Sequence, residues 1–301
     1  MIQTLTNNIS CNDLGIVLMH EHVFNKYPPK YIDNNISYTL QLLKEVQKFS
    51  VKTIIDLTPY NSPDLYNSII DDSNINIIGC VGFYLYNYIP KRLRNKNEVE
   101  LVRYFSNIIE KGTKKYKYKP GILKIASSSD NIKDIEYKYF NVITTLQKKY
   151  NLPIATHSPK GFYSHYLYFK ENKINLSKIY FCHSEFFIND NNFDDKIIQL
   201  VEIVHSGAYL LFSKFGTNYN SNRFKQTLKI VKHLIENGYI NHILLSSDCN
   251  WKWKYGIPKL QNGNNDYSYI FTYIIPGLLK AGISTNEIYQ IMVINPYNLL
   301  K

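Results

Sequence analysis

The chain has few cysteines and no long uninterrupted apolar run, and both absences exclude classes of protein. Its 301 residues include four scattered cysteines: Cys11, Cys80, Cys182 and Cys249. Because no two of them form a CxxC pair, we expect neither a disulfide framework nor a structural zinc knuckle. The longest apolar stretch, residues 269–279, is interrupted by threonine, proline and glycine. It falls short of the roughly 18–20 apolar residues that a membrane-spanning helix needs.

A basic start followed by an apolar segment, the pattern of a signal peptide, is also missing near the N-terminus. We therefore expect a soluble cytoplasmic protein without a membrane partner. Acidic residues are in the minority, with 24 Asp and Glu against 35 Lys and Arg, and the formal charge is +11. The basic residues are spread along the chain, and solvated faces and loops explain their densest clusters, 91–96 and 111–119. We expect no nucleic-acid partner; an anionic small substrate is the better reason for positive charge near a site.

Short apolar runs alternate with stretches of helical period along the chain. Eight runs are predicted to be strands: 15–22, 52–58, 75–84, 121–127, 153–158, 178–184, 208–216 and 242–248. Helices are predicted over 38–49, 99–111, 134–150, 194–205, 224–237 and 267–280, with weaker signals over 64–70 and 161–171. Gly207 and Gly238 follow two of these helices as C-terminal caps. A last helix is predicted over 285–292, after Ser284 as its N-cap and ending before Pro296.

Eight β/α units in one continuous run favour an α/β fold of the (β/α)8 TIM-barrel type. An open doubly wound sheet would carry a glycine-rich phosphate turn after an early strand, and the sequence has none. The hydrophobic content of 45% is sufficient for a large core. Barrels of about 250 residues form one domain, so we predict a single domain over residues 1–301.

Side chains that bind metals recur at the ends of the first, fourth, fifth, sixth and eighth predicted strands. They are His20, His22, Lys124, His157, His183 and Asp248. The loops that follow barrel strands converge at one rim, so these six side chains are predicted to meet there. The alternation of strand side chains predicts that His20 and His22 face the interior while Glu21 points away. By the same alternation, Cys182 is expected to pack outward if His183 faces inward.

Four imidazoles and one carboxylate suit zinc, with manganese, iron or cobalt as alternatives. They exceed the needs of one tetrahedral catalytic zinc, but two metals about 3.5–4 Å apart would use them all if a further group bridges them. Lys124 is the exception, because an ammonium has no lone pair. A neutral lysine carboxylated by CO2 would resolve the conflict, since the carbamate offers one oxygen to each metal. Each of the six residues alone has an ordinary structural explanation; the six together favour a metal site.

Together these residues resemble the phosphotriesterase family of the amidohydrolase superfamily over nearly the whole chain. The resemblance rests on HEH at 20–22, GILKIA at 121–126, single histidines after two strands, SSD at 246–248 and NPYNLL at 295–300. It implies one metal held by His20, His22 and Asp248. It implies a second metal held by His157 and His183.

The resemblance also implies that carboxylated Lys124 and a hydroxide bridge the two metals, and that Asp248 accepts the hydroxide's proton during attack. Tyr84 matches a family position that lines the substrate pocket. The chain departs from the family's lactonases after the seventh predicted strand. They carry an aspartate–arginine pair in a DRxG-like context, whereas this chain reads SKFG at 213–216, with Lys214 in place of arginine. Lysine keeps the charge but loses the planar fork of arginine.

A second departure lies at the eighth predicted strand. Ser247 replaces the usual histidine before the aspartate, and the next loop, CNWKWKYGIP, is unusual. Trp251 of this loop either lines the pocket or caps the barrel end. These changes leave all six predicted metal ligands in place, but they make the identity of the substrate harder to predict from the family.

Such a centre predicts a metal-dependent hydrolase, a phosphotriesterase-like lactonase or esterase in which a metal-bridging hydroxide attacks the carbonyl. Lys214 and the Lys/Trp-rich loop favour a polar or anionic lactone, such as a sugar lactone or its phosphate, with phosphotriester hydrolysis as a weak side reaction. Hydrolysis of small N-acyl compounds is the alternative. A metal-binding barrel without catalysis is disfavoured, because no ligand is missing. The expected partner is a small-molecule substrate, and a homodimer is left open.

Overall fold

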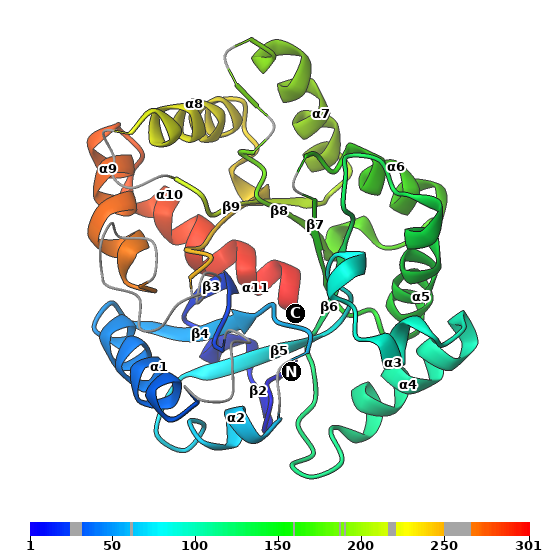
Figure 1. The fold of residues 1–301 in the computed structure, drawn as a ribbon. Helices are drawn as coiled ribbons and strands as arrows, with labels where there is room; N and C mark the ends of the chain where they lie inside the picture. Colours follow the sequence, from blue (N-terminus) through cyan, green and yellow to red (C-terminus); the bar gives the residue numbers. More distant parts are fainter. Residues whose placement is uncertain are drawn as a thin grey trace.

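The computed structural model describes residues 1–24, 32–60, 63–158, 160–186, 188–189, 191–215, 221–249 and 266–301. Eight parallel strands within these residues form a nearly closed barrel with helices around its outside (Figure 1). They are β3 (Ile16–Glu21), β4 (Val51–Asp56), β5 (Asn76–Gly82), β6 (Ile122–Ala126), β7 (Ile154–His157), β8 (Ile179–Cys182), β9 (Tyr209–Phe212) and β10 (Ile243–Leu245). The order in the sheet follows the chain from β3 to β10. All eight predicted strands and the (β/α)8 barrel are confirmed.

The α-helices of the described residues are α1 (Ile32–Gln47), α2 (Pro63–Asn67), α3 (Lys91–Arg94), α4 (Glu98–Lys111), α5 (Asp134–Tyr150), α6 (Tyr163–Glu171), α7 (Phe193–His205), α8 (Asn222–Glu236), α9 (Ile275–Lys280), α10 (Thr285–Tyr289) and α11 (Asn295–Leu300). Each predicted helical stretch overlaps one of these helices, and α3 and α11 are helices that were not predicted. Gly207 and Gly238 have φ values of 92° and 85°, the left-handed backbone predicted for C-terminal caps. Ser284 accepts a hydrogen bond from the amide of Glu287, so the predicted N-cap is also confirmed.

The prediction that the last helix ends before Pro296 is wrong. A π-helical turn, Gln290–Ile294, joins α10 to α11, and Pro296 lies in the first turn of α11. Pro276 follows a second π-helical turn, Ile270–Ile274, at the start of α9. Proline has no amide hydrogen to donate. A preceding π turn shifts the hydrogen-bond pattern, and the chain continues as helix through both prolines.

Alternation along the strands divides the core into two layers. Residues such as Val17 and Ala155 pack inside the barrel, whereas Leu123 and Ile125 pack between the strands and the helices. The N-terminal end of the barrel is closed by the hairpin of β1 (Ile2–Gln3) and β2 (Asn8–Ile9) together with α11, whose residues join the inner layer. Among the described helices, none is long and apolar enough to cross a membrane. The loops that carry the polar side chains lie at the opposite, C-terminal end of the barrel.

Candidate metal centre

The six predicted ligands converge on one cavity at the C-terminal end of the barrel. They are delivered by β3, β6 and β7 and by the residues that follow β8 and β10. The cavity has a volume of about 90 Å³ and is lined by His20, His22, Tyr84, Lys124, His157, His183, Phe186, Lys214 and Asp248. The predicted convergence of residues that are up to 228 positions apart in the chain is therefore observed.

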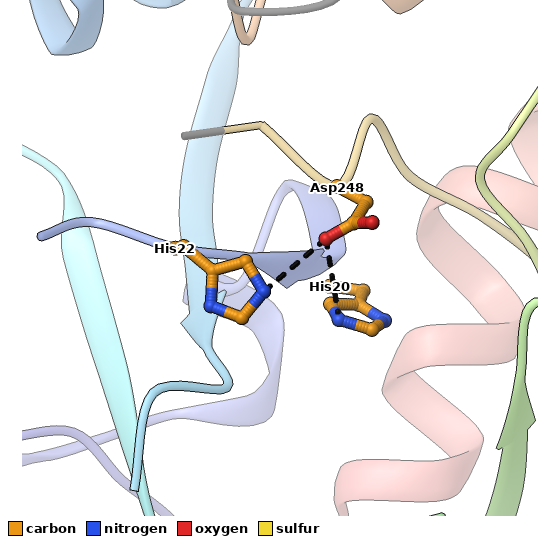
Figure 2. Close-up of side chains that lie close together, drawn as sticks. All are labelled: His20, His22 and Asp248. Carbon is orange, nitrogen blue, oxygen red and sulfur yellow. Dashed lines mark ion pairs between the residues drawn. The ribbon is translucent and has the colours of Figure 1, made fainter. Parts of the chain in front are cut away.

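Asp248 lies at the centre of this group (Figure 2). Its Oδ1 atom is 3.5 Å from Nε2 of His20 and 3.2 Å from Nε2 of His22. Its Oδ2 atom is 3.9 Å from Nε2 of His183 and forms an ion pair with Nζ of Lys214. Burial raises the pKa of Asp248, but the positive charge of Lys214 is the largest opposing effect, and the pKa is held well below its usual range. The carboxylate is therefore ionised at neutral pH.

A chain of hydrogen bonds fixes which nitrogen of His22 faces Asp248. The buried carboxylate of Asp56 accepts from the amide of Thr58 at 2.9 Å, from the Thr58 hydroxyl and from Tyr66. The Thr58 oxygen lies 2.8 Å from Nδ1 of His22; since the Thr58 hydroxyl donates to Asp56, its oxygen accepts a hydrogen bond from Nδ1–H of His22. His22 therefore presents the lone pair of Nε2 to Asp248, the orientation in which an imidazole binds a metal.

The donor set fits a divalent cation. The ligand atoms of His20, His22 and Asp248 lie within 4.8 Å of one another. Within the described residues, Oδ1 of Asp248 and Nδ1 of His20 are buried without a hydrogen-bond partner. Because Nε2 of His22 and Oδ1 of Asp248 both offer lone pairs, a cation between them would satisfy two groups that otherwise repel. Two imidazoles and a carboxylate are a ligand set that zinc accepts.

His157 and His183 form the second half of the group. Their ring centroids are 4.8 Å apart, and the rings of His20 and His183 are also 4.8 Å apart. Burial lowers the pKa of His183 to about 3, and burial together with nearby positive groups holds the pKa values of His20 and His157 well below their usual range. These three imidazoles are neutral at pH 7, which is the form that coordinates metals.

Lys124 lies beneath the imidazoles with its side chain almost completely buried, at 1% exposure. Its Nζ atom is 3.9 Å from Sγ of Cys182, and no described carboxylate forms an ion pair with it. A buried ammonium without a counter-ion is costly. These surroundings differ from those of a lysine that only stabilises the fold. The amine of Lys124 lies near the imidazoles of His20, His157 and His183.

The strand-alternation predictions have two outcomes. His20 and His22 both line the cavity while Glu21 points away from it toward the end of β10, as predicted. The prediction that Cys182 packs outward is wrong, because its thiol faces Lys124 in the barrel interior. Strand β8 ends at Cys182, and His183 adopts a left-handed backbone with φ of 61°, so alternation no longer applies and both side chains face inward.

Three side chains were predicted to contact substrate. Tyr84 lines the cavity beside His157, and burial together with the charge of Asp248 raises the pKa of Tyr84 to about 12. Lys214 also lines it, bound to Asp248. Trp251 lies outside the described residues.

Comparison with known proteins decides the family. The model of the phosphotriesterase family matches residues 1–300. The chain belongs to the phosphotriesterase family. As a phosphotriesterase-family protein it is a metal-dependent hydrolase, so the alternative of a barrel without catalysis is set aside. The binuclear metal dependence of this family agrees with the two groups of ligands in the cavity.

Relatives of this family are distant. The chain is 26% identical over 314 residues to an aryldialkylphosphatase of Saccharolobus solfataricus, covering 96% of each chain. It is 24% identical over 238 residues to an N-acetyltaurine hydrolase of Xenopus tropicalis, covering 75% of this chain and 65% of that one. A mutant of a PTE-like lactonase of Deinococcus radiodurans has the same fold, with a TM-score of 0.87, 20% identity and full coverage of both chains.

Sequence reasoning missed two features of this phosphotriesterase-family site. Phe186 stacks on His183 at a centroid distance of 5.1 Å and forms one wall of the cavity. Glu185 is buried and accepts hydrogen bonds from the amides of Ser213 and Lys214, at 3.4 Å and 2.7 Å, and so ties the loop after β8 to the end of β9. Burial raises the pKa of Glu185 to about 7. A glutamate two residues after a ligand histidine was the available signal for Glu185; nothing in the sequence singles out Phe186.

Proposed function

We propose that this protein holds two divalent metal ions and hydrolyses a small polar or anionic lactone or ester. The observation that carries the proposal is the convergence of four imidazoles, Asp248 and Lys124 on one cavity, in which the ligand atoms of His20, His22 and Asp248 lie within 4.8 Å of one another. Zinc is the first expectation, with manganese, cobalt and iron as alternatives.

The ligands divide into two groups. His20, His22 and Asp248 would hold one metal, and His157 and His183 would hold the other. Lys124, carboxylated by CO2, would contribute one oxygen to each, which replaces a buried ammonium by an anion between two cations. When bound, two such metals lower the pKa of water and polarise the carbonyl oxygen of the substrate.

The residues of the chain supply the remaining tasks. Asp248 is the group that would accept the proton released by the attacking water, because its carboxylate is ionised and its oxygens lie among the imidazoles that line the cavity. Lys214 places a positive charge beside the same carboxylate in the cavity lining, where it would attract an anionic group of the substrate. Tyr84 beside His157 and Phe186 beside His183 form aromatic walls of the cavity, whose volume of about 90 Å³ limits it to a small substrate.

A lactone is favoured because metals bound at such a centre would polarise its planar ester carbonyl, and Lys214 in the cavity lining favours a polar or anionic substituent. Hydrolysis of a small N-acyl compound is the second candidate. It is supported by the relative named as an N-acetyltaurine hydrolase, whose substrate joins an amide to an anionic group. Both candidates place a negative charge near Lys214, and they differ in the bond that is cleaved. Phosphotriester hydrolysis is expected only as a weak side reaction.

The test combines metal analysis with a substrate screen. Protein loaded with zinc or manganese should contain close to two metals per chain. The screen should span sugar lactones, phosphorylated lactones, acyl-homoserine lactones, N-acyl amino acids, N-acetyltaurine and paraoxon. Highest kcat/KM on an anionic lactone supports the proposal, and highest kcat/KM on an N-acyl compound supports the alternative. Preference for long acyl-homoserine lactones, or full activity in excess chelator, would contradict both.

A further inference from the structure

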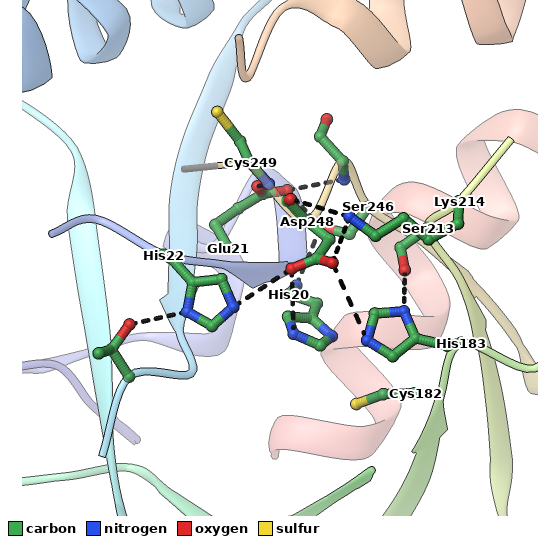
Figure 3. Close-up of polar contacts among 12 residues, drawn as sticks. His20, Glu21, His22, Cys182, His183, Ser213, Lys214, Ser246, Asp248 and Cys249 are labelled. Atoms are coloured by element: carbon green, nitrogen blue, oxygen red, sulfur yellow. Dashed lines mark hydrogen bonds and ion pairs between the residues drawn. The ribbon is translucent and has the colours of Figure 1, made fainter. Parts of the chain in front are cut away.

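Glu21 is a buried carboxylate that the metal centre itself does not use. Its Oε1 atom accepts hydrogen bonds from the hydroxyl of Ser246 at 2.6 Å and from the amide of Ser247 at 2.8 Å. Its Oε2 atom accepts from the amide of Cys249 at 2.7 Å. The two amides flank Asp248 on either side in sequence, so one carboxylate holds both peptide groups around this ligand (Figure 3).

Glu21 lies where the first and last strands of the barrel, β3 and β10, meet; we call this junction the barrel seam. The sheet is hydrogen-bonded continuously from β3 to β10, but within the described residues no strand ladder joins β3 to β10. Individual contacts close this gap. The amide of His20 donates to the hydroxyl of Ser246 at 2.9 Å, the amide of Asp248 to the carbonyl of His20 at 3.1 Å, and the amide of His22 to the carbonyl of Cys249 at 3.2 Å.

Asp248 needs such support because its backbone is left-handed, with φ of 49°. Aspartate adopts this conformation more readily than most residues, but it remains less stable than the ordinary regions. A register shift in the pairing of β3 with β4 between Leu18 and Glu21 aims Glu21 at the seam. Such irregularities re-aim side chains near active sites.

We propose that Glu21 is a positioning residue that locks Asp248 against His20 and His22 across the barrel seam. It sets the geometry of the three side chains that would hold one metal, and it does so without touching the cavity, whose lining does not include it. This inference rests on the proposed metal-holding role of those three residues.

Replacement of Glu21 by glutamine isolates this role, because the side chain keeps its volume and one oxygen. The amide nitrogen must face either the amide of Ser247 or that of Cys249, and two donors then oppose each other. The comparison with wild type does not depend on whether Glu21 is ionised. In the carboxylate and in the carboxylic acid alike, each oxygen has a lone pair that can accept the amide of Ser247 or Cys249. Asp248 would lose the support on one side.

Glu136 offers a matched control. It is also a buried glutamate whose two oxygens each accept a backbone amide, from Ser128 at 2.8 Å and from Lys133 at 3.1 Å. Glu136→Gln therefore loses the same kind of bond at the start of α5, away from the barrel seam. Any effect of E21Q that E136Q shares is general destabilisation.

The first measurement is hydrogen exchange of chelated, metal-free protein, followed by mass spectrometry. Amides of 243–249 should exchange at least tenfold faster in E21Q than in wild type, whereas in E136Q the faster exchange should be confined to 127–136. If wild-type protein takes up no metal, the proposed function fails, but this measurement still tests the clamp. Two results would overturn the inference. In the first, amides of 243–249 in folded E21Q exchange at the wild-type rate. In the second, they exchange faster in E21Q, but to the same extent as in E136Q.

The second measurement is metal retention. Titration with a chelator should remove one metal from E21Q at about 10- to 100-fold lower chelator concentration than from wild type, while the other metal is retained as in wild type. The loaded variant should show lower kcat with little change in KM. Equal retention of both metals by E21Q and wild type would refute the link to the metal site. If E21Q does not fold, Ser246→Ala replaces it. This change keeps Glu21 and its two backbone amides and removes the hydroxyl that links Glu21 to the amide of His20. At least threefold faster exchange in 243–249 is expected, and wild-type exchange there would refute the clamp.

Discussion

His165 makes the barrel sensitive to mild acid, and the size of the effect follows from its surroundings. The ring is completely buried, with Nδ1 2.6 Å from the Thr156 hydroxyl and Nε2 2.7 Å from the Ser127 hydroxyl. It packs edge-on against Phe140 at 4.8 Å. Burial lowers the pKa of His165 from its ordinary value of 6.5 to about 3. The folded protein therefore keeps this histidine neutral at pH values where the unfolded chain protonates it.

The direction of the effect follows from proton linkage. Below pH 6.5 the unfolded chain binds a proton at His165 that the folded protein does not bind, so stability falls as the pH decreases toward 3. The loss approaches about 1.4 kcal/mol per pH unit. Integrated from pH 7 to pH 5 with these two pKa values, it amounts to about 2 kcal/mol from this residue alone.

The assay is urea unfolding of chelated protein at pH 8, 7 and 5 for wild type and His165→Gln. Glutamine keeps a neutral hydrogen-bonding group and cannot titrate, so the variant should lose about 2 kcal/mol less than wild type between pH 7 and pH 5. Between pH 8 and pH 7 the two proteins should lose stability in parallel, which controls for the general cost of the substitution. Parallel behaviour down to pH 5 would refute the assignment of His165 as a buried neutral histidine.

Four further predictions concern the site. Asp248→Asn should lower kcat by at least about 100-fold while metal analysis finds most of the metal retained; equal turnover would exclude Asp248 as the proton acceptor. Lys124→Ala should lose at least one metal per chain, measured by elemental analysis, and two retained metals would contradict the bridging role. Lys214→Ala should raise KM for anionic substrates more than for neutral ones of the same ring size, and an equal rise would remove Lys214 from substrate recognition. Thr58→Ala frees Nδ1 of His22 and should weaken metal retention about tenfold; a chelator titration that superimposes on wild type would show that this hydrogen bond does not matter.

The barrel could be predicted because its strands are buried on both faces. Continuous apolar runs such as 179–182 and 208–212 have no alternating polar face, and each is followed by a helical stretch, which is the pattern of a parallel barrel. The ends of the strands were predicted too late, because the terminal residues of each run belong to the loops that carry polar side chains. The continuation of the last helix through Pro296 depends on a π turn, and proline normally signals that a helix stops.

The gathering of the six candidate ligands could be predicted because histidine, lysine and aspartate stand at strand ends, which meet at one rim of a barrel. Their supports could not, because they depend on contacts between distant segments. Glu21 meets Ser247 across 226 positions, and Glu185 meets Lys214 across 29. The left-handed backbone at His183 and Asp248 could not be predicted from the sequence either. At His183 it ends the strand alternation, which is why the prediction for Cys182 was wrong.

The left-handed backbone of His183 and Asp248 helps to explain how their side chains are positioned in the cavity. His183 and Asp248 each follow the end of a strand and turn back toward the cavity, in a conformation that costs energy. Each turn is held by a buried glutamate that binds neighbouring backbone amides: Glu185 at the end of β9, and Glu21 at the end of β10. Hydrogen bonds from backbone amides to a buried carboxyl group are directional, whereas apolar packing is not. Substitutions that reshape the cavity walls at Tyr84 or Phe186 should therefore alter substrate choice without loosening the metal ligands, whereas changes to either glutamate should loosen the ligands and leave the walls in place.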